Sequence, residues 1–159
     1  DRQDTWVFYA EAPLSSHLKE QLLDPLATSI EGLSQEDAAN VLINFVQTAF
    51  EYQTDDEQWG YERPFFPEET LFYPYSDCED RSILFARLVK ELMGLDVVFL
   101  HYPGHLATAV RFDEAIAGDH LMIEGGKYLV CDPTYINASI GMQMPQMEGK
   151  DVNVIRITN

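Results

Sequence analysis

Three side chains of this sequence, Cys78, His105 and Asp132, have the chemistry of a thiol nucleophile, a base and an orienting carboxylate. Cys78 stands directly before a strongly apolar stretch with helical spacing. A thiol in the first turn of a helix lies near unpaired backbone N–H groups and the positive end of the helix dipole, and both favour the thiolate. The thiolate attacks carbonyl carbons, and the same N–H groups are placed to bind the resulting oxyanion.

The acidic neighbours of Cys78 oppose this ionisation. Asp77, Glu79 and Asp80 raise the pKa of the thiol, so a nearby imidazolium is needed to offset them. We expect Ser76 to cap the helix and to form a capping box with Glu79, which puts Cys78 at the second helical position.

Four histidines could supply the imidazole. His17 lies in an N-terminal helical region and His120 follows a polar turn, so both are expected at the surface. His105 opens a strand of small residues, 107–109, beside which a helix carrying a nucleophile can approach closely. His105 is therefore the preferred base, and His101, inside an apolar strand, is the alternative.

Asp132 follows the apolar strand residues 128–131. A carboxylate at this position can accept the Nδ1–H of an imidazole on a neighbouring strand, which fixes the tautomer and stabilises the charge. The alternative is a simple Asp-Pro turn with Pro133. Because side chains alternate along a strand, Cys131 is interpreted as a buried small apolar residue and not as a second nucleophile.

Helices are expected before these strands. β-Branched and aromatic residues favour a β segment at 5–10, whereas apolar spacing favours helices in most of the segment that follows. The predicted helices are 18–30 with a break and restart at Asp24-Pro25, one capped by Ser34 and extending to about Tyr52, and 76–93 ended by Gly94.

The second half of the chain has the pattern of strands on short turns. The predicted strands are 96–102, 105–112, 120–124, 127–132 and 152–157, with turns at Pro103-Gly104 and Gly125-Gly126. Such strands form an antiparallel sheet with the helices segregated before it. We therefore predict a single α+β domain spanning residues 1–159.

Composition limits the classes of partner. The chain has 159 residues, 46% of them hydrophobic, which predicts a substantial core. Its formal charge of −17 repels phosphates, so nucleic acid and anionic membranes are not expected partners. No apolar run approaches the ~18 residues of a membrane span. The sequence begins at Asp1 without methionine and is interpreted as a mature form or an excised domain, which leaves the localisation open and permits export.

Three motifs together resemble the transglutaminase-like superfamily, whose core is a papain-like fold with a cysteine nucleophile. In that family a cysteine within Asp-Cys-x-Asp opens a helix, a histidine starts a strand, and the aspartate of Asp-Pro-Thr ends a later strand. The matching runs, over a core of about 36–135, are Asp77-Cys78-Glu79-Asp80, Gly104-His105-Leu106-Ala107 and Cys131-Asp132-Pro133-Thr134. The spacing of 27 residues between successive site residues is as compact as in a minimal bacterial member.

This resemblance implies that Cys78 is the nucleophile, His105 the general base and acid, and Asp132 the orienting carboxylate. It implies a cysteine-dependent amide-bond hydrolase, a peptidase or amidase, that acts on a peptide or protein through a thioester. Two alternatives stay open, a transglutaminase that transfers the acyl group to an amine and a catalytically silent binding domain.

The resemblance leaves other parts of the site unassigned. Trp59, Tyr73 and Tyr75 are candidates for a side-chain donor to the oxyanion, and the acidic, aromatic stretch 55–69 could select a substrate or only anchor a loop. No cofactor and no metal are expected. His101 and His105 are four residues apart but are predicted on different strands.

Overall fold

The computed structural model describes residues 2–49, 51–52, 67 and 75–157. Its helices are α1 (Arg2–Glu11), α2 (Ser16–Leu18), α3 (Asp24–Ile30), α4 (Gln35–Thr48) and α7 (Cys78–Met93), with a π-helical turn at Lys19–Leu23 and a 3₁₀ turn at Pro145–Met147. The strands are β1 (Glu51–Tyr52), β2 (Tyr75–Ser76), β3 (Asp96–Tyr102), β4 (His105–Arg111), β5 (His120–Ile123), β6 (Gly126–Cys131) and β7 (Asn153–Arg156).

The main sheet has the strand order β5-β6-β4-β3-β7, and every neighbouring pair in it is antiparallel. The helices precede it in the chain, which confirms the predicted α+β class. A separate parallel pair joins β1 to β2, so that the segment directly before α7 lies beside the segment that follows α4.

Apolar side chains cover both faces of the main sheet. One face packs with the helices in the larger core cluster, which includes Phe99, Leu106 and Leu129. The opposite face forms a second cluster that includes Leu100, Tyr102 and Tyr128. The strands read as nearly continuous apolar runs for this reason, since both sets of alternating side chains are buried.

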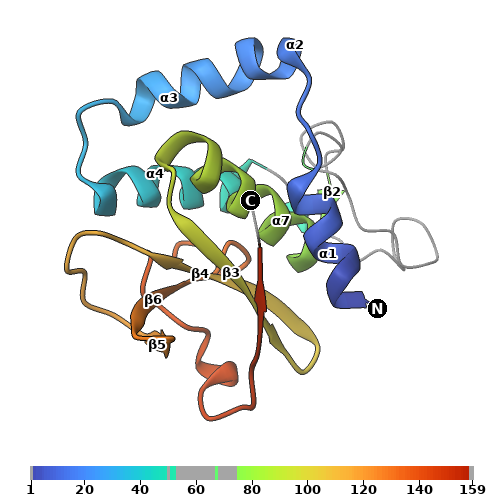
Figure 1. Ribbon diagram of the computed structural model, residues 1–159, viewed down its shortest axis with the longest axis vertical. Coiled ribbons are helices and arrows are strands. Elements are labelled where there is room, and N and C mark those ends of the chain that lie inside the picture. Colours follow the sequence, from blue (N-terminus) through green and yellow to red (C-terminus); the bar gives the residue numbers. More distant parts are fainter. Residues whose placement is uncertain (1, 50, 53–66, 68–74, 158–159) are drawn as a thin grey trace.

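Helix α7 occupies the centre of the molecule. It packs on β3 and β4 and also contacts α4 and α1, while α3 lies on the outer side of α4 (Figure 1). Almost every residue from Glu79 to Val89 is buried, as expected for a helix that is apolar on more than one side. Gly94 ends α7 in the left-handed conformation at φ 65°, as predicted.

The β segment predicted at 5–10 is wrong, because these residues belong to α1. Trp6 and Ala10, one helical turn apart, are each only 1% exposed and face the core. Arg87 of α7 donates to the carbonyl of Ala10 at 2.9 Å, which holds α1 along α7. Packing of one helical face therefore overrides the local β preference of the aromatic residues.

The break predicted at Asp24-Pro25 does not occur. Leu23 and Asp24 keep right-handed helical dihedral angles, and Pro25 lies in the first turn of α3, where a missing N–H is tolerated. The irregularity is the π-helical turn just before it, in which the N–H of Asp24 donates to the carbonyl of Lys19. Helix α4 begins as predicted at Ser34 but ends at Thr48, and Tyr52 lies in β1.

The two predicted turns have different outcomes. Pro103-Gly104 joins β3 to β4 as predicted, with Gly104 at φ 72°. In the β5–β6 hairpin the register pairs Ile123 with Gly126, so the turn residues are Glu124 and Gly125, both at positive φ. Gly126 is a strand residue instead, and a Cβ there would lie 3.0 Å from Nε of the Arg111 side chain.

Replacing Ser34 with alanine tests the start of α4. The Ser34 hydroxyl accepts the N–H of Asp37 at 3.1 Å, and its loss should lower the free energy of unfolding by about 1 kcal/mol in urea denaturation. Ser29→Ala is the matched control, because the Ser29 hydroxyl only donates to the Pro25 carbonyl on an exposed helix surface. Equal losses in both variants would contradict the capping role.

Candidate active site

The first turn of α7 is capped by Asp77 and not by the predicted Ser76. The Asp77 carboxylate accepts the N–H of Asp80 at 3.0 Å, and the Asp80 carboxylate accepts the N–H of Asp77 at 3.2 Å, which completes a capping box. Ser76 lies one residue before the cap, where its backbone pairs with Tyr52 in the β1–β2 ladder. Cys78 consequently occupies the first helical position, one earlier than predicted.

His105 and Asp132 are joined by a short hydrogen bond in a buried setting. His105 Nε2 lies 2.7 Å from Asp132 Oδ2, and the two side chains are 8% and 2% exposed. The other carboxylate oxygen, Oδ1, accepts the N–H of Thr134 at 2.9 Å. Asp132 therefore has both oxygens engaged, and its orientation toward the imidazole is fixed from two directions.

The ring nitrogen that meets Asp132 is Nε2, whereas Nδ1 was predicted. The register pairs Thr108 with Cys131, so Asp132 falls beyond the last pair and diagonally across from His105. Diagonal neighbours in a sheet are about 7–8 Å apart, a span that suits the outer nitrogen of the ring. Nδ1 is thereby left as the nitrogen that does not face the carboxylate.

Cys78 lies against the start of β4. Burial raises the pKa of its thiol to about 12, and the charges of Asp77, Glu79 and Asp132 act in the same direction. A hydrogen bond from the Leu106 backbone, next to His105, opposes that rise. The structure thus brings all three predicted residues to one place, the junction of the α7 start with the ends of β4 and β6.

Helix α7 is also attached directly to β4 at this junction. The hydroxyl of Ser82, one turn after Cys78, donates to the Leu106 carbonyl at 3.0 Å. The Thr108 hydroxyl donates to the Cys131 carbonyl at 2.6 Å and joins β4 to β6 just before Asp132. These two bonds set the positions of helix α7 and the two strands relative to one another.

Two aromatic residues of the site were not predicted. Trp6 donates its indole N–H to buried Glu79 at 3.1 Å and packs edge-on against His101 with ring centroids 4.9 Å apart. Tyr102 stacks near His105, with centroids 6.4 Å apart and an interplanar angle of 30°. The Tyr102–His105 contact could have been found from the hairpin register across Pro103-Gly104, but nothing near Glu79 in the sequence points to Trp6.

Burial also affects the phenol of Tyr102. Its pKa is raised, first by burial and then by the charges of Asp132 and Asp119. The phenol therefore stays protonated beside the His105 ring and adds no negative charge of its own to a site that already holds several carboxylates.

The other cysteine and histidines lie where they were expected. Cys131 is fully buried in the core, and burial raises the pKa of its thiol. His101 lies on β3, across from Leu106 and on a different strand from His105. His17 and His120 are exposed, and His120 Nδ1 is 3.0 Å from the carbonyl of Gly118.

Several expectations fall on residues that the structure does not describe. Trp59, Tyr73 and nearly all of the stretch 55–69 lie outside the described residues, and Tyr75 belongs to β2. Among the residues that are described, no group of three or more His, Cys, Asp or Glu side chains is arranged to hold a metal ion. The described helices also include none with the length and apolar character needed to cross a membrane.

Comparison with known proteins identifies the fold. No protein-family model and no curated protein sequence matches the chain. Among solved structures, the chain is similar to EGTA-treated LapG of Legionella pneumophila at 14% identity and a TM-score of 0.55, covering 94% of this chain and 78% of that one. Calcium-bound LapG of the same organism gives 12% identity and a TM-score of 0.54, covering 99% of this chain and 88% of that one.

These similarities show the fold of the protein. The chain has the transglutaminase-like fold, with an antiparallel sheet and the helix that starts at Cys78 packed on it. The low identity means that the likeness concerns the arrangement of elements. The roles of individual side chains have to be argued from this chain's own contacts.

Replacing Glu79 with glutamine should make Cys78 more reactive. The negative charge of Glu79 raises the pKa of the thiol, whereas the amide of glutamine keeps an oxygen that accepts the Trp6 indole N–H. Below the pKa the alkylation rate is proportional to the thiolate fraction, so the rate at Cys78 should rise severalfold at fixed pH, as followed by peptide mapping.

Glu91→Gln is the control for this prediction. Glu91 lies in the last turn of the same helix and pairs with Arg87 at 2.9 Å. Its replacement should leave the alkylation rate of Cys78 unchanged. A rate that falls in Glu79→Gln, or that rises equally in both variants, would refute the electrostatic influence of Glu79 on the thiol.

Proposed function

We propose that the protein is a cysteine-dependent amide-bond hydrolase, a peptidase or amidase, with Cys78, His105 and Asp132 as its catalytic residues. The observation that carries the proposal is the buried 2.7 Å bond between His105 and Asp132 beside the thiol of Cys78. Buried titratable side chains with a specific charge partner are concentrated at functional sites. LapG, similar in fold, is a cysteine protease, which supports a peptide or protein substrate.

In the proposed mechanism His105 first takes the proton of Cys78. The thiolate attacks the carbonyl carbon of the amide, a C–S bond forms, and the carbonyl electron pair moves to oxygen. Backbone N–H groups in the first turn of α7 stabilise this oxyanion. The tetrahedral intermediate collapses, the C–N bond breaks, and His105 gives its proton to the departing amine, which leaves a thioester on Cys78.

The thioester is then hydrolysed through the same groups. His105 removes a proton from water while the hydroxide that forms attacks the thioester carbon. Collapse of the second oxyanion breaks the C–S bond and releases the carboxylic acid. Cys78 leaves as a thiolate and His105 holds the proton, which restores the starting pair. Asp132 stabilises the imidazolium in both halves of the reaction.

The environment of Cys78 makes this mechanism depend on His105. A thiol with a pKa of about 12 is ionised in only about one molecule in 10⁵ at pH 7, too few for rapid attack. A positive imidazolium next to the sulfur counteracts the carboxylates of Asp77 and Glu79 and lowers the pKa of the thiol. The reactive form is therefore a thiolate–imidazolium pair and not a free thiolate.

Alkylation by iodoacetamide tests this dependence. The wild-type protein should react rapidly at Cys78 at pH 6–7, where His105→Ala should be slower by about a hundredfold or more. In His105→Ala the rate should then climb about tenfold per pH unit toward the pKa of the unassisted thiol. His120→Ala, a histidine at the exposed start of β5, is the matched control and should react like the wild type.

One observation favours a second candidate, a catalytically silent peptide-binding domain. The raised pKa of Cys78 is the opposite of what an isolated nucleophile requires. This candidate predicts that Cys78 in the wild-type protein reacts no faster than an ordinary thiol and that His105→Ala changes nothing. Such a result would exclude the hydrolase.

A digest of a peptide library separates hydrolysis from acyl transfer to an amine. The hydrolase should yield free carboxylates with a mass gain of one water, with or without added primary amine, and Cys78→Ala should yield none. A transglutaminase would instead incorporate the amine and release ammonia. Mass spectrometry of the products distinguishes the two outcomes, and predominant amine incorporation would contradict the proposal of hydrolysis.

A further inference from the structure

Helix α4 carries a buried amide that the mechanism has not used. Gln47 is 1% exposed and shares the core-facing side of the helix with Ile43 and Val46. A side chain with two N–H donors is costly to bury unless both are hydrogen-bonded. The partners of this amide therefore indicate what it does in the fold.

Both side-chain N–H groups of Gln47 donate hydrogen bonds to the segment that carries Asp132. Its Nε2 donates to the backbone carbonyl of Asp132 at 3.2 Å and to that of Ala138 at 3.1 Å. These carbonyls belong to the irregular segment 132–141 that follows β6, which has few strand bonds of its own. A primary amide has two N–H groups and can satisfy two carbonyls at once.

A second amide of α4 holds the far end of the same segment. Asn40 lies seven residues before Gln47, so the two residues are two helical turns apart on one side of α4. The Asn40 side-chain oxygen accepts the N–H of Ile140 at 2.9 Å. Segment 132–141 is therefore fixed to α4 near both of its ends.

Gln47 also connects this segment to the helix of the nucleophile. Arg81, three residues after Cys78 and 1% exposed, donates from Nη1 to the backbone carbonyl of Gln47 at 3.3 Å. One residue of α4 thus touches α7 through its backbone and Asp132 through its side chain. Gln47 therefore forms a direct link between α7 and the backbone of Asp132.

We propose that Gln47 is a positioning residue that holds Asp132 in register with His105 and Cys78. This inference rests on the proposed function, in which Asp132 orients the imidazole. Gln47 acts through the backbone of Asp132 and does not touch the reacting atoms. Removing its donors leaves the Asp132 carbonyl with only the local N–H of Tyr135 at 3.3 Å and no bond to α4. The carboxylate can then move, which weakens the His105 Nε2–Asp132 Oδ2 bond.

Gln47→Met tests the inference, because methionine keeps the length of the side chain and removes both donors. Alkylation of Cys78 at pH 6–7 should slow by about tenfold, since small displacements of an orienting group are costly. The same change in an Asp132→Asn background should have little further effect. A merely structural role would slow both backgrounds by the same factor.

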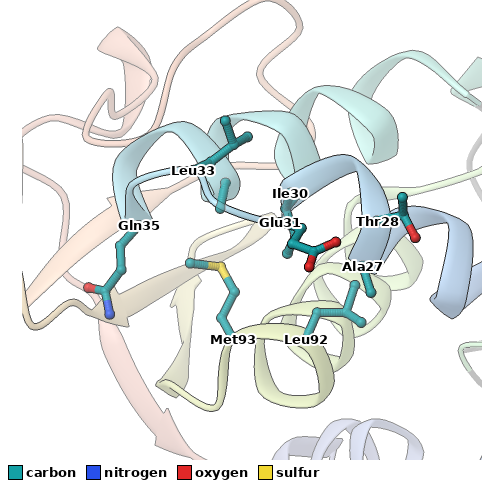
Figure 2. A pocket seen from close by; sticks show the side chains of 9 residues that line it. Ala27, Thr28, Ile30, Glu31, Leu33, Gln35, Leu92 and Met93 are labelled. Carbon is teal, nitrogen blue, oxygen red and sulfur yellow. The ribbon is translucent and has the colours of Figure 1, made fainter.

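Gln35→Met is the matched control on the same helix. Gln35 also joins α4 to a loop, donating to the Asp113 carboxylate at 3.0 Å and accepting the Asp113 N–H at 2.9 Å. It lies at the edge of a groove of about 470 Å³ that is bordered by Leu33, Leu92 and Met93 (Figure 2). This control should leave the alkylation rate unchanged.

Nuclear magnetic resonance of the His105 ring gives a second readout that does not need a reactive thiol. The Nε2–H proton shared with Asp132 should give a downfield resonance in the wild type and in Gln35→Met. In Gln47→Met that resonance should move upfield or broaden. An unreactive wild-type Cys78 would end the proposed function, yet this resonance would still decide whether Gln47 positions Asp132.

Asn40→Ala covers the case in which Gln47→Met does not fold. Asn40 is only half-buried, and its replacement removes the hydrogen bond that joins Ile140, near the other end of segment 132–141, to α4. It should shift the His105 resonance in the same direction by a smaller amount. The inference is overturned if the resonance is unchanged in the folded variants, or if alkylation slows equally with and without Asp132→Asn.

Discussion

The start of helix α7 is buried together with its carboxylates, and the rest of the structure has to supply hydrogen-bond partners for them. Asp77 and Asp80 are 7% and 1% exposed, so each must be hydrogen-bonded to remain there. The capping box satisfies them with the N–H groups of the first turn, and Trp6 of α1 supplies the partner for Glu79. The carboxylates of Asp77 and Glu79 also raise the pKa of the thiol between them, so the arrangement that stabilises the turn disfavours the thiolate.

Much of the fold could be predicted because its elements are encoded locally. The strands 96–102 and 105–112 and the stop at Gly94 were predicted from apolar runs and turn residues, and they lie where expected. The error at 5–10 arose because the aromatic residues there were interpreted by propensity, whereas contact with α7 makes the segment a helix. The prediction placed the β5–β6 turn one residue too late, because only the strand register determines which glycine lies in the turn.

The positions of the candidate site residues could be predicted to the extent that each residue stands at the end of a helix or strand. Cys78, His105 and Asp132 could be located from the sequence because a helix start and two strand ends were recognisable there. The groups that hold these three side chains in place could not be located from the sequence. Gln47 and Trp6 act over separations of 85 and 73 residues, and no local pattern distinguishes a bridging amide from any other buried glutamine. That Asp132 contacts Nε2 of His105 likewise follows from the diagonal offset between the two residues, which only the sheet register reveals.

The long sequence separations between these contacting residues affect how the protein folds during its synthesis. During synthesis Trp6 and Gln47 leave the ribosome first, Cys78 follows, and Asp132 comes well after it. The contacts around the thiol involve β4 and the end of β6, so they need both strands in the sheet, and contacts of such long sequence separation are slow to form. A nascent chain therefore carries Cys78 before His105 and Asp132 are in position, so the proposed hydrolase would be inactive toward neighbouring polypeptides until these strands have formed.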